Sequence, residues 1–361
     1  SGEWSSQPLT DFMNFKNGLN PDAKRFGRGT KFISVMDILN NQYICYDNIR
    51  ASVELQDGDI ETYGVDYGDI LFQRSSETLE DVGRANVYLD SKPAIFGGFV
   101  IRGKSKGNYN PLFFRYLLAS PTARKRIIVK GAGAQHFNIG QDGLSKVSLD
   151  IPRLSEQEKI GKLLQCVDAR IATQTKIIEK LQSLIKGLTV TLTTVGKPNT
   201  TISQCLECHS STLQESEVLP NGLCRVFGAN GLVGYKDVPQ MNSDAILVIK
   251  DGSGVGTVSY AQGKFSVIGT LNYFTVIGNN DLRYLYFALS VFNFQPYKTG
   301  MAIPHIYFKD YGKAKIYCPS LAEQKRVANV LDKLESKLFV EQELLASFNQ
   351  QKQYLLGKMF I

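Results

Sequence analysis

The chain has 361 residues, a length that suits two domains rather than one. Its hydrophobic fraction of 43% is enough to build cores, and 41 basic against 34 acidic residues give a net charge of +7, which favours anionic partners. No apolar run approaches the roughly 18 residues that a membrane span needs, and no signal peptide is evident. The six cysteines show no disulfide spacing, so we expect a protein of the reducing cytoplasm.

Residues 1–150 are predicted to form a first module of mixed α/β structure. Short β-rich runs at 69–72 and 94–98 are separated by Gly, Asn and Asp, and 110–117 has the pattern of a short helix capped by Asn110. Between Asp90 and Asp142 there are nine basic residues and no acidic one, with aromatic residues interleaved. A stretch of one charge sign is typical of a surface that neutralises phosphates, and a solvated basic face is the alternative.

Residues 151–195 are predicted to form a long helix. Its heptad pattern places a seam along one face that includes Leu164, Ile171, Gln174 and Ile178. The β-branched, Gly- and Pro-containing run at 189–201 interrupts the helical pattern, so we expect the linker to the next module there.

Residues 196–317 are predicted to form a second module. The runs at 245–248, 267–270 and 280–287 resemble the strands and the helix expected in the first module. The basic bias is repeated more weakly, since Asp281 is the sole acidic residue between Gly252 and Lys309. His136 and His305 occupy similar places in the two modules, and each is expected either to lie in a loop that contacts a ligand or to be a structural residue of a turn.

Residues 318–361 are predicted to form a second long helix with a seam that includes Leu331, Leu338, Glu341 and Leu345. If the two helices pair antiparallel, Gln174 lies near Glu341; the alternative is two independent helices that each cover their own module. Lys352 also falls on this seam, so the last turns are expected to splay or to serve a partner.

Two motifs allow an enzymatic alternative, either a nucleotide-binding protein or a DNA methyltransferase, and a third suggests a haem or metal site. The segment 98–105 matches a phosphate loop, but its interior is strand-like and no helix start follows. The segment 110–113 is one letter from an amino-methyltransferase motif, without its second Pro. The segment 205–209 has the spacing of a haem attachment, with Cys224 as a further metal ligand, but free or buried thiols are favoured. The sequence therefore favours a protein without a catalytic site; a helical scaffold is the other alternative.

A repeated motif begins both long helices and resembles a known family. Pro152, Leu154, Glu156 and Gln157 recur as Pro319, Leu321, Glu323 and Gln324, at an offset of 319 − 152 = 167 residues. This doubled motif, and the run 226–235, resemble the specificity subunit of type I restriction–modification systems. The resemblance implies an α+β fold: two mixed α/β target-recognition domains joined and separated by two long helices that form an antiparallel coiled coil, with a pseudo-twofold internal repeat.

The resemblance also implies a function and partners. Each module would read one half of a bipartite double-stranded DNA target, and the helices would dock two modification (methyltransferase) subunits. Those subunits would supply S-adenosylmethionine and catalysis, while restriction subunits would act with ATP and Mg²⁺. This chain itself would hold no cofactor and no metal.

Candidate DNA-binding residues were chosen because bases are read by side chains that carry hydrogen-bond donors and acceptors, and phosphates by basic side chains. The candidates are Arg102, Lys104, Lys130, Gln135 and His136 in the first module and Lys250, Ser253, Lys264, Asn272, Lys298 and His305 in the second.

Overall fold

The computed structural model describes residues 4–133 and 136–360. The chain forms two compact units: one comprises the residues up to Thr175 together with those from Leu344 onward, and the other comprises Lys176–Glu343. Each unit therefore contains one module and parts of both long helices.

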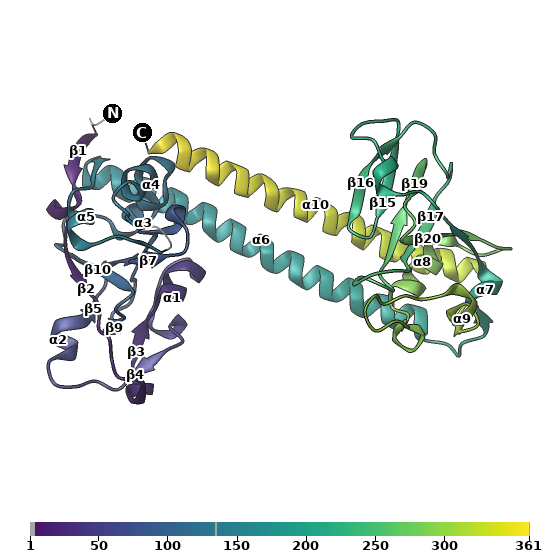
Figure 1. Ribbon diagram of the computed structural model, residues 1–361, viewed down its shortest axis with the longest axis horizontal. Coiled ribbons are helices and arrows are strands. Elements are labelled where there is room, and N and C mark those ends of the chain that lie inside the picture. Colours follow the sequence, from purple (N-terminus) through teal and green to yellow (C-terminus); the bar gives the residue numbers. More distant parts are fainter. Residues whose placement is uncertain (1–3, 134–135, 361) are drawn as a thin grey trace. The chain divides into compact units, whose positions relative to one another are not determined.

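The first module contains two four-stranded sheets (Figure 1). One has the order β2-β10-β6-β8 with every neighbouring pair antiparallel, and the other has the order β4-β3-β9-β5 with β3 and β9 parallel. The strands are β2 Met13–Asn17, β3 Phe26–Ile33, β4 Ser52–Val53, β5 Gly64–Val65, β6 Ile70–Gln73, β8 Ala85–Val87, β9 Ala94–Phe96 and β10 Val100–Ser105. Two short pairs, β1 with β12 and β7 with β11, complete it: β1 Ser5–Pro8, β12 Ser148–Ile151, β7 Ser75–Ser76 and β11 Phe137–Asn138.

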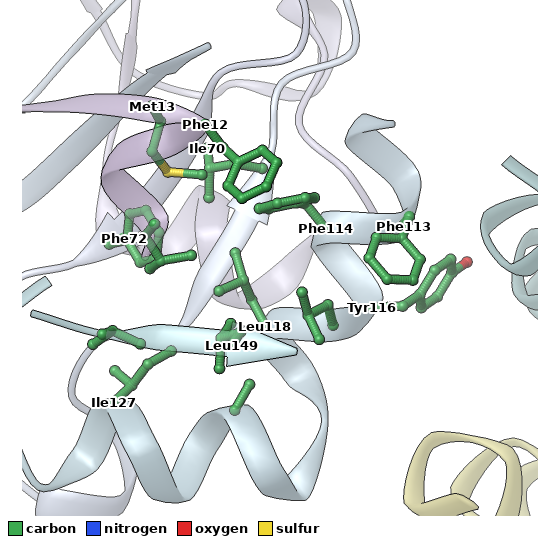
Figure 2. Packing of buried hydrophobic residues seen from close by; sticks show 14 of the residues in the cluster. Phe12, Met13, Ile70, Phe72, Phe113, Phe114, Tyr116, Leu118, Ile127 and Leu149 are labelled. Atoms are coloured by element: carbon green, nitrogen blue, oxygen red, sulfur yellow. The ribbon is translucent and has the colours of Figure 1, made fainter. Parts of the chain in front are cut away.

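The helices of this module are α1 Val35–Asn40, α2 Asp59–Tyr63, α3 Pro111–Ala119, α4 Pro121–Ile128 and α5 Gln141–Ser145. Helix α3 carries aromatic side chains into the core, where the rings of Phe12 and Phe114 lie 5.0 Å apart between centroids (Figure 2). The same core includes Leu164 from the first long helix and Leu356 from the second. Burial of this apolar surface fixes both helices to the module.

The second module repeats the main antiparallel sheet of the first. Its order β14-β20-β17-β18 matches β2-β10-β6-β8, with all pairs antiparallel. These strands are β14 Leu206–Ser210, β20 Leu271–Val276, β17 Ala245–Ile249 and β18 Val258–Ala261. A three-stranded sheet and a two-stranded pair complete it: β15 Cys224–Gly228, β16 Gly231–Lys236, β19 Phe265–Val267, β13 Thr200–Thr201 and β21 Lys315–Ile316. Its helices are α7 Ile202–Cys205, α8 Leu282–Ser290 and α9 Phe308–Tyr311. The predicted mixed α/β modules and their repeat are confirmed.

The two long helices are α6 Leu154–Thr194 and α10 Leu321–Met359. In the first unit the beginning of α6 packs with the end of α10, and in the second unit Leu188 of α6 packs with the cluster that contains Leu331 of α10. The helices are therefore antiparallel, as predicted. Burial along both follows the predicted seam, which is buried or half-buried at every position. A contact between Gln174 and Glu341 would join the two units, and it stays a prediction.

Helix α6 does not end where the β-branched run predicted. The hydroxyls of Thr189, Thr191 and Thr193 donate to the carbonyl oxygens of the residues four positions earlier, at 2.8, 2.9 and 2.7 Å. These bonds give each threonine hydroxyl a hydrogen-bond partner within the helix, although threonine has a low helix propensity. The helix thus runs on to Thr194, and the expected linker start at residue 189 was wrong.

A buried glutamine attaches each module to its long helix. Gln157 Nε2 donates to the Pro152 carbonyl at 2.9 Å, and its Oε1 accepts from the backbone N–H of Asn110, the N-cap of α3, at 3.0 Å. Gln324 repeats both bonds in the second unit, to the Pro319 carbonyl and from the N–H of Asp281, the N-cap of α8, at 2.8 Å each. Gln157 is 2% exposed and Gln324 1%. The repeated Glu-Gln motif therefore has a structural reason.

An ionic cluster reinforces this attachment in the first unit. The Asp168 carboxylate, 5% exposed, accepts from Tyr116 at 2.7 Å and from Arg115 at 3.2 Å, and it pairs with Lys352 at 2.6 Å. Burial alone would raise the pKa of Asp168, but the hydrogen bonds from Lys352 and Tyr116 and the nearby positive charges outweigh it and hold that pKa below its usual value. Lys352 thus binds α10 to α6 within this unit, and the expectation that its turns splay was wrong.

We predict that Gln157→Leu lowers the free energy of unfolding by about 1–3 kcal/mol, because it leaves the Asn110 N–H and the Pro152 carbonyl buried without a partner. Urea unfolding measures the change. The control is Gln165→Leu on an exposed position of α6, which should cost less than about 0.5 kcal/mol. Equal stabilities for the two variants would contradict the role of Gln157.

We predict that Asp168→Asn destabilises the protein by about 3 kcal/mol at pH 7, because it leaves Lys352 and Arg115 without their carboxylate. The folded-state pKa is lowered, so this stability is present above the unfolded pKa and is lost as the pH falls through the folded one. The difference from the parent protein should therefore shrink below about pH 4. Asp150→Asn, which removes a more exposed pair with Arg126, should cost under about 1 kcal/mol. A pH-independent difference would refute this account.

Candidate nucleic-acid interface

The same closed loop occurs in both modules. In the second, Thr299 and His305 exchange two backbone hydrogen bonds of 2.9 and 2.8 Å; in the first, Ala132 and Asn138 do the same, at 2.9 and 2.8 Å. The two loops are related by the offset of the helix motifs, since 299 − 132 = 167 and 305 − 138 = 167. The counterpart of His305 is therefore Asn138, and His136 lies two positions earlier in its own loop, so the two histidines occupy similar but not equivalent places.

A glycine with a positive φ angle shapes each loop. Gly133 has φ 147° and Gly300 has φ 88°. A Cβ atom at these positions would lie 2.0 Å from the carbonyl oxygen of His136 and 2.3 Å from that of Ile303, respectively. Both the backbone angle and the close approach require glycine at each of these positions, which are themselves equivalent, since 300 − 133 = 167.

Each loop is fastened to the segment that follows the main-sheet strand β6 or β17. Ile139 N–H donates to the Arg74 carbonyl at 2.9 Å, and Ile306 N–H donates to the Lys250 carbonyl at 3.0 Å. We call these two-segment surfaces the paired loops: residues 74–76 with 130–133 and 136–139 in the first module, and 250–256 with 298–307 in the second. Arg74 and Lys250 are equivalent positions in them.

The paired loops of the second module bring together four of the six candidates predicted there, namely Lys250, Ser253, Lys298 and His305. Tyr307 adds an aromatic ring, 4.9 Å from that of His305 between centroids, and Lys309 Nζ lies 5.2 Å from the Tyr307 centroid. Lysine, histidine and tyrosine side chains supply cations, a hydrogen-bonding ring and a stacking face, the groups that contact phosphates and bases.

The other two candidates of the second module lie elsewhere. Lys264 is exposed in the turn between β18 and β19. Asn272 is buried in β20, where its Oδ1 accepts from the Ser210 hydroxyl at 3.0 Å. Asn272 thus has an internal partner and is not presented to a ligand.

In the first module, Lys130 and His136 are exposed members of the paired loops, while Gln135 lies outside the described residues. Arg102 and Lys104 are in β10 and are engaged within the fold. Arg102 is 8% exposed and donates to the Gly64 carbonyl, and Lys104 pairs with Asp66 and, at 3.3 Å, with Asp69.

The acid-poor stretch misled the choice of Arg102 and Lys104. Their carboxylate neighbours come from outside that stretch, since Asp66 and Asp69 precede β6, the strand next to β10. Burial lowers the pKa of Arg102 and raises that of Asp69, as expected for charges taken from water. A charge count along the sequence does not include such pairs.

Sequence reasoning missed Arg74, Tyr307 and Lys309. Arg74 is half-buried and donates to the Gly98 carbonyl at 3.2 Å. Arg74 could have been found from the sequence, because a basic residue directly follows the equivalent buried strand in both modules, Arg74 after β6 and Lys250 after β17.

The motifs that suggested enzymes have structural roles. Residues 100–105 of the phosphate-loop match form strand β10, and Asn110 caps α3, its Oδ1 accepting from Phe113 N–H at 2.9 Å with Pro111 in the first turn. Across the described part of the chain, no group of three or more His, Cys, Asp or Glu side chains is placed to hold a metal ion. None of the helices in residues 4–133 and 136–360 is long and apolar enough to span a membrane.

The fold and the paired loops define a duplicated two-module protein, in which each module carries its own paired loops and is attached to a long helix by the same glutamine contacts. The chain belongs to the family of type I restriction–modification DNA specificity domains, whose sequence pattern matches residues 1–183 and 210–350. The resemblance of the repeated helix-start motif is thereby confirmed.

Individual relatives agree with the family. The chain is 26% identical over 199 residues to a putative type I restriction enzyme MjaX specificity subunit from Methanocaldococcus jannaschii, and 24% identical over 123 residues to the EcoprrI specificity subunit from Escherichia coli. These matches cover 54% and 34% of this chain, and they span less than half of the relatives, 46% and 29%.

Two solved structures share the fold. The crystal structure of a type I restriction–modification S subunit from M. genitalium has a TM-score of 0.67 at 17% identity, covering 100% of this chain and 97% of that one. A structure described for complex assembly and conformational transition of the type I restriction–modification system has a TM-score of 0.60 at 12% identity, covering 98% and 96%.

Proposed function

We propose that this chain is the DNA sequence-specificity subunit of a type I restriction–modification system and that each pair of loops contacts one half of a bipartite double-stranded DNA target. The observation that carries the proposal is the duplicated paired loop. One backbone frame occurs twice, with basic residues at equivalent positions and different side chains around them. Two loop surfaces with different side chains suit a DNA target whose two halves have different sequences.

The basic residues of the paired loops supply phosphate contacts, and the polar side chains supply base contacts. Arg74, Lys130, Lys250 and Lys298 are the proposed phosphate contacts. His136, Ser253 and His305 are the proposed base contacts, with Gln135 kept from the sequence analysis. Arg102, Lys104, Lys264 and Asn272 are left out because they are paired inside the fold or lie outside these loops.

The duplicated attachments suit two copies of one partner. Each unit combines a long-helix start, a glutamine attachment and a module helix in the same arrangement, and repeated surfaces bind repeated subunits. We infer that two modification subunits dock on the helices and that restriction subunits join through them. In this proposal S-adenosylmethionine, ATP and Mg²⁺ are held by those subunits, and this chain takes no catalytic part.

We predict that Lys250→Ala combined with Lys298→Ala weakens DNA binding and lowers the slope of log affinity against log salt by about 0.9 for each phosphate that is no longer neutralised. The assay is fluorescence anisotropy of a duplex with the chain assembled with its modification subunit, at several salt concentrations. Lys264→Ala is the matched control, since it removes an exposed lysine of the same module outside the paired loops. An equal effect of the control would refute the assignment of the loops.

The alternatives of an enzyme and of a scaffold make different predictions. We expect isothermal titration of the chain alone with S-adenosylmethionine and with ATP to show no binding, because the two motifs that suggested such sites form a strand and a helix cap. Tight binding of either compound would favour an enzyme. An assembled complex that binds DNA without salt dependence or sequence preference would favour a scaffold.

A further inference from the structure

The second unit holds two thiols in contact at the start of α10. Cys205 ends α7 and is completely buried, whereas Cys318 lies half-buried between β21 and α10. The two Sγ atoms are 3.9 Å apart, and the residues are separated by 113 positions in the sequence. Both cysteines are free.

The surroundings of the two sulfur atoms differ. Cys205 donates its S–H to Cys318 Sγ, and Gln324 Nε2 donates to Cys318 Sγ at 3.2 Å. The hydrogen bond from Cys205 lowers the pKa of Cys318, and the same bond together with burial raises that of Cys205. Cys318 is thus the more acidic and the more exposed of the two thiols, and Cys205 lies buried behind it.

The backbone holds Cys318 at this distance. Asn199 Oδ1 accepts from the Cys318 N–H and Asn199 Nδ2 donates to its carbonyl, each at 2.9 Å. The strand pair β13–β21 ends two residues before Cys318, and Pro319 follows it. As a thiol, Cys318 also contacts Asn280 Oδ1 at 3.3 Å. These contacts hold the Cys318 sulfur beside that of Cys205 while both cysteines are reduced.

We propose that Cys205 and Cys318 form a site of reversible oxidation, in which a hydroperoxide converts the two thiols to a disulfide that ties α7 to the start of α10. The Cys318 thiolate attacks the terminal oxygen of the hydroperoxide and the O–O bond breaks. The products are a sulfenic acid and an alkoxide, or hydroxide when the oxidant is hydrogen peroxide, and this anion takes up a proton to leave as an alcohol or as water. Cys205 then attacks the sulfenic sulfur, the S–S bond forms, and the hydroxyl leaves as water with the Cys205 proton. Two electrons pass from the thiols to the peroxide, and an added dithiol reverses the reaction.

The bond would change the attachment of the second module. Gln324, which donates to Cys318, is the residue that attaches α8 to α10. A disulfide across a loop of this length restricts the unfolded chain and stabilises the folded unit. The residue equivalent to Cys318 in the first unit is Ile151, since 318 − 151 = 167, so oxidation acts on the second module alone.

The test treats the full-length chain with hydrogen peroxide and follows it by intact mass, peptide mapping and thermal unfolding. We expect a mass decrease of two hydrogen atoms, a crosslinked peptide that joins Cys205 to Cys318, and a midpoint of unfolding raised by roughly 5 °C, all reversed by dithiothreitol. Oxidation of Cys318 to the sulfinic acid without a crosslink would overturn the proposal, as would a crosslink through Cys166 instead.

Single variants separate the two roles. Cys205→Ser, or Cys205→Ala if the serine variant folds poorly, should leave a sulfenic acid on Cys318 that dimedone labels. Cys318→Ser should abolish the crosslink and leave no dimedone label on the peptide that contains Cys205, because Cys205 is buried. Cys166→Ser, which removes an exposed thiol of α6, should still form the crosslink. Dimedone labelling of Cys205 in the Cys318→Ser protein would contradict the assignment.

Discussion

The attachment of each module to its long helix depends on one buried glutamine side chain. A glutamine amide has both a donor and an acceptor, so one side chain satisfies the proline carbonyl before the long helix and the N-cap amide of the module helix. Because both bonds are buried, losing either leaves a polar group without a partner, at a cost comparable to a large part of a domain's stability. The module helix and the long helix are therefore held at a fixed angle within each unit.

Other contacts elaborate the attachment differently in the two units. Gly161 in α6 lets the N-terminus of α3 approach closely, since a Cβ there would lie 2.9 Å from Asn110 Oδ1. Asp168 in the first unit and Glu335 in the second are equivalent, as 335 − 168 = 167, and both accept from the module helix. Asp168 also pairs with Lys352, whereas Glu335 is paired with Arg283 of α8. An acidic residue of the long helix therefore accepts a hydrogen bond from the module helix in both units, but in the first unit it also pairs with a lysine of the other long helix.

Much of the fold could be predicted from the sequence because its signals are periodic or local. The heptad seam, the strand at 245–249 and the Asn110 cap follow from patterns within a few residues. Two predictions were wrong because the deciding contacts are not local in the sequence or not typical of the residue type. The threonines of α6 bond to their own helix, and Lys352 meets a carboxylate 184 residues earlier, 352 − 168 = 184.

The candidate site was predictable only in part for the same reason. Lys250, Lys298 and His305 come together because a loop bonds to the segment after a strand, a pairing that no sequence window contains. Arg102 and Lys104 lie in a basic stretch of the sequence, but in the fold Lys104 pairs with acids that precede the neighbouring strand, and Arg102 donates to the Gly64 carbonyl. Arg102 and Lys104 are two positions apart in β10, so both side chains lie on the same face of the sheet, where Asp66 and Asp69 are close to them.

The repeated loop frame explains how two modules can share one architecture and differ in what they contact. The position of the loop is fixed by backbone hydrogen bonds and by one glycine with a positive φ angle, so it does not depend on which side chains the loop carries.

The side chains of the loop therefore differ between the modules. Asn138 in one module corresponds to His305 in the other, and His136 corresponds to Ile303. A hydrogen-bonding residue and an apolar residue at matching positions cannot make the same contacts with a base edge, because the major groove presents donors, acceptors and methyl groups in distinct patterns. Within the proposed function, the frame determines where each module contacts DNA and the exchanged side chains determine what it reads.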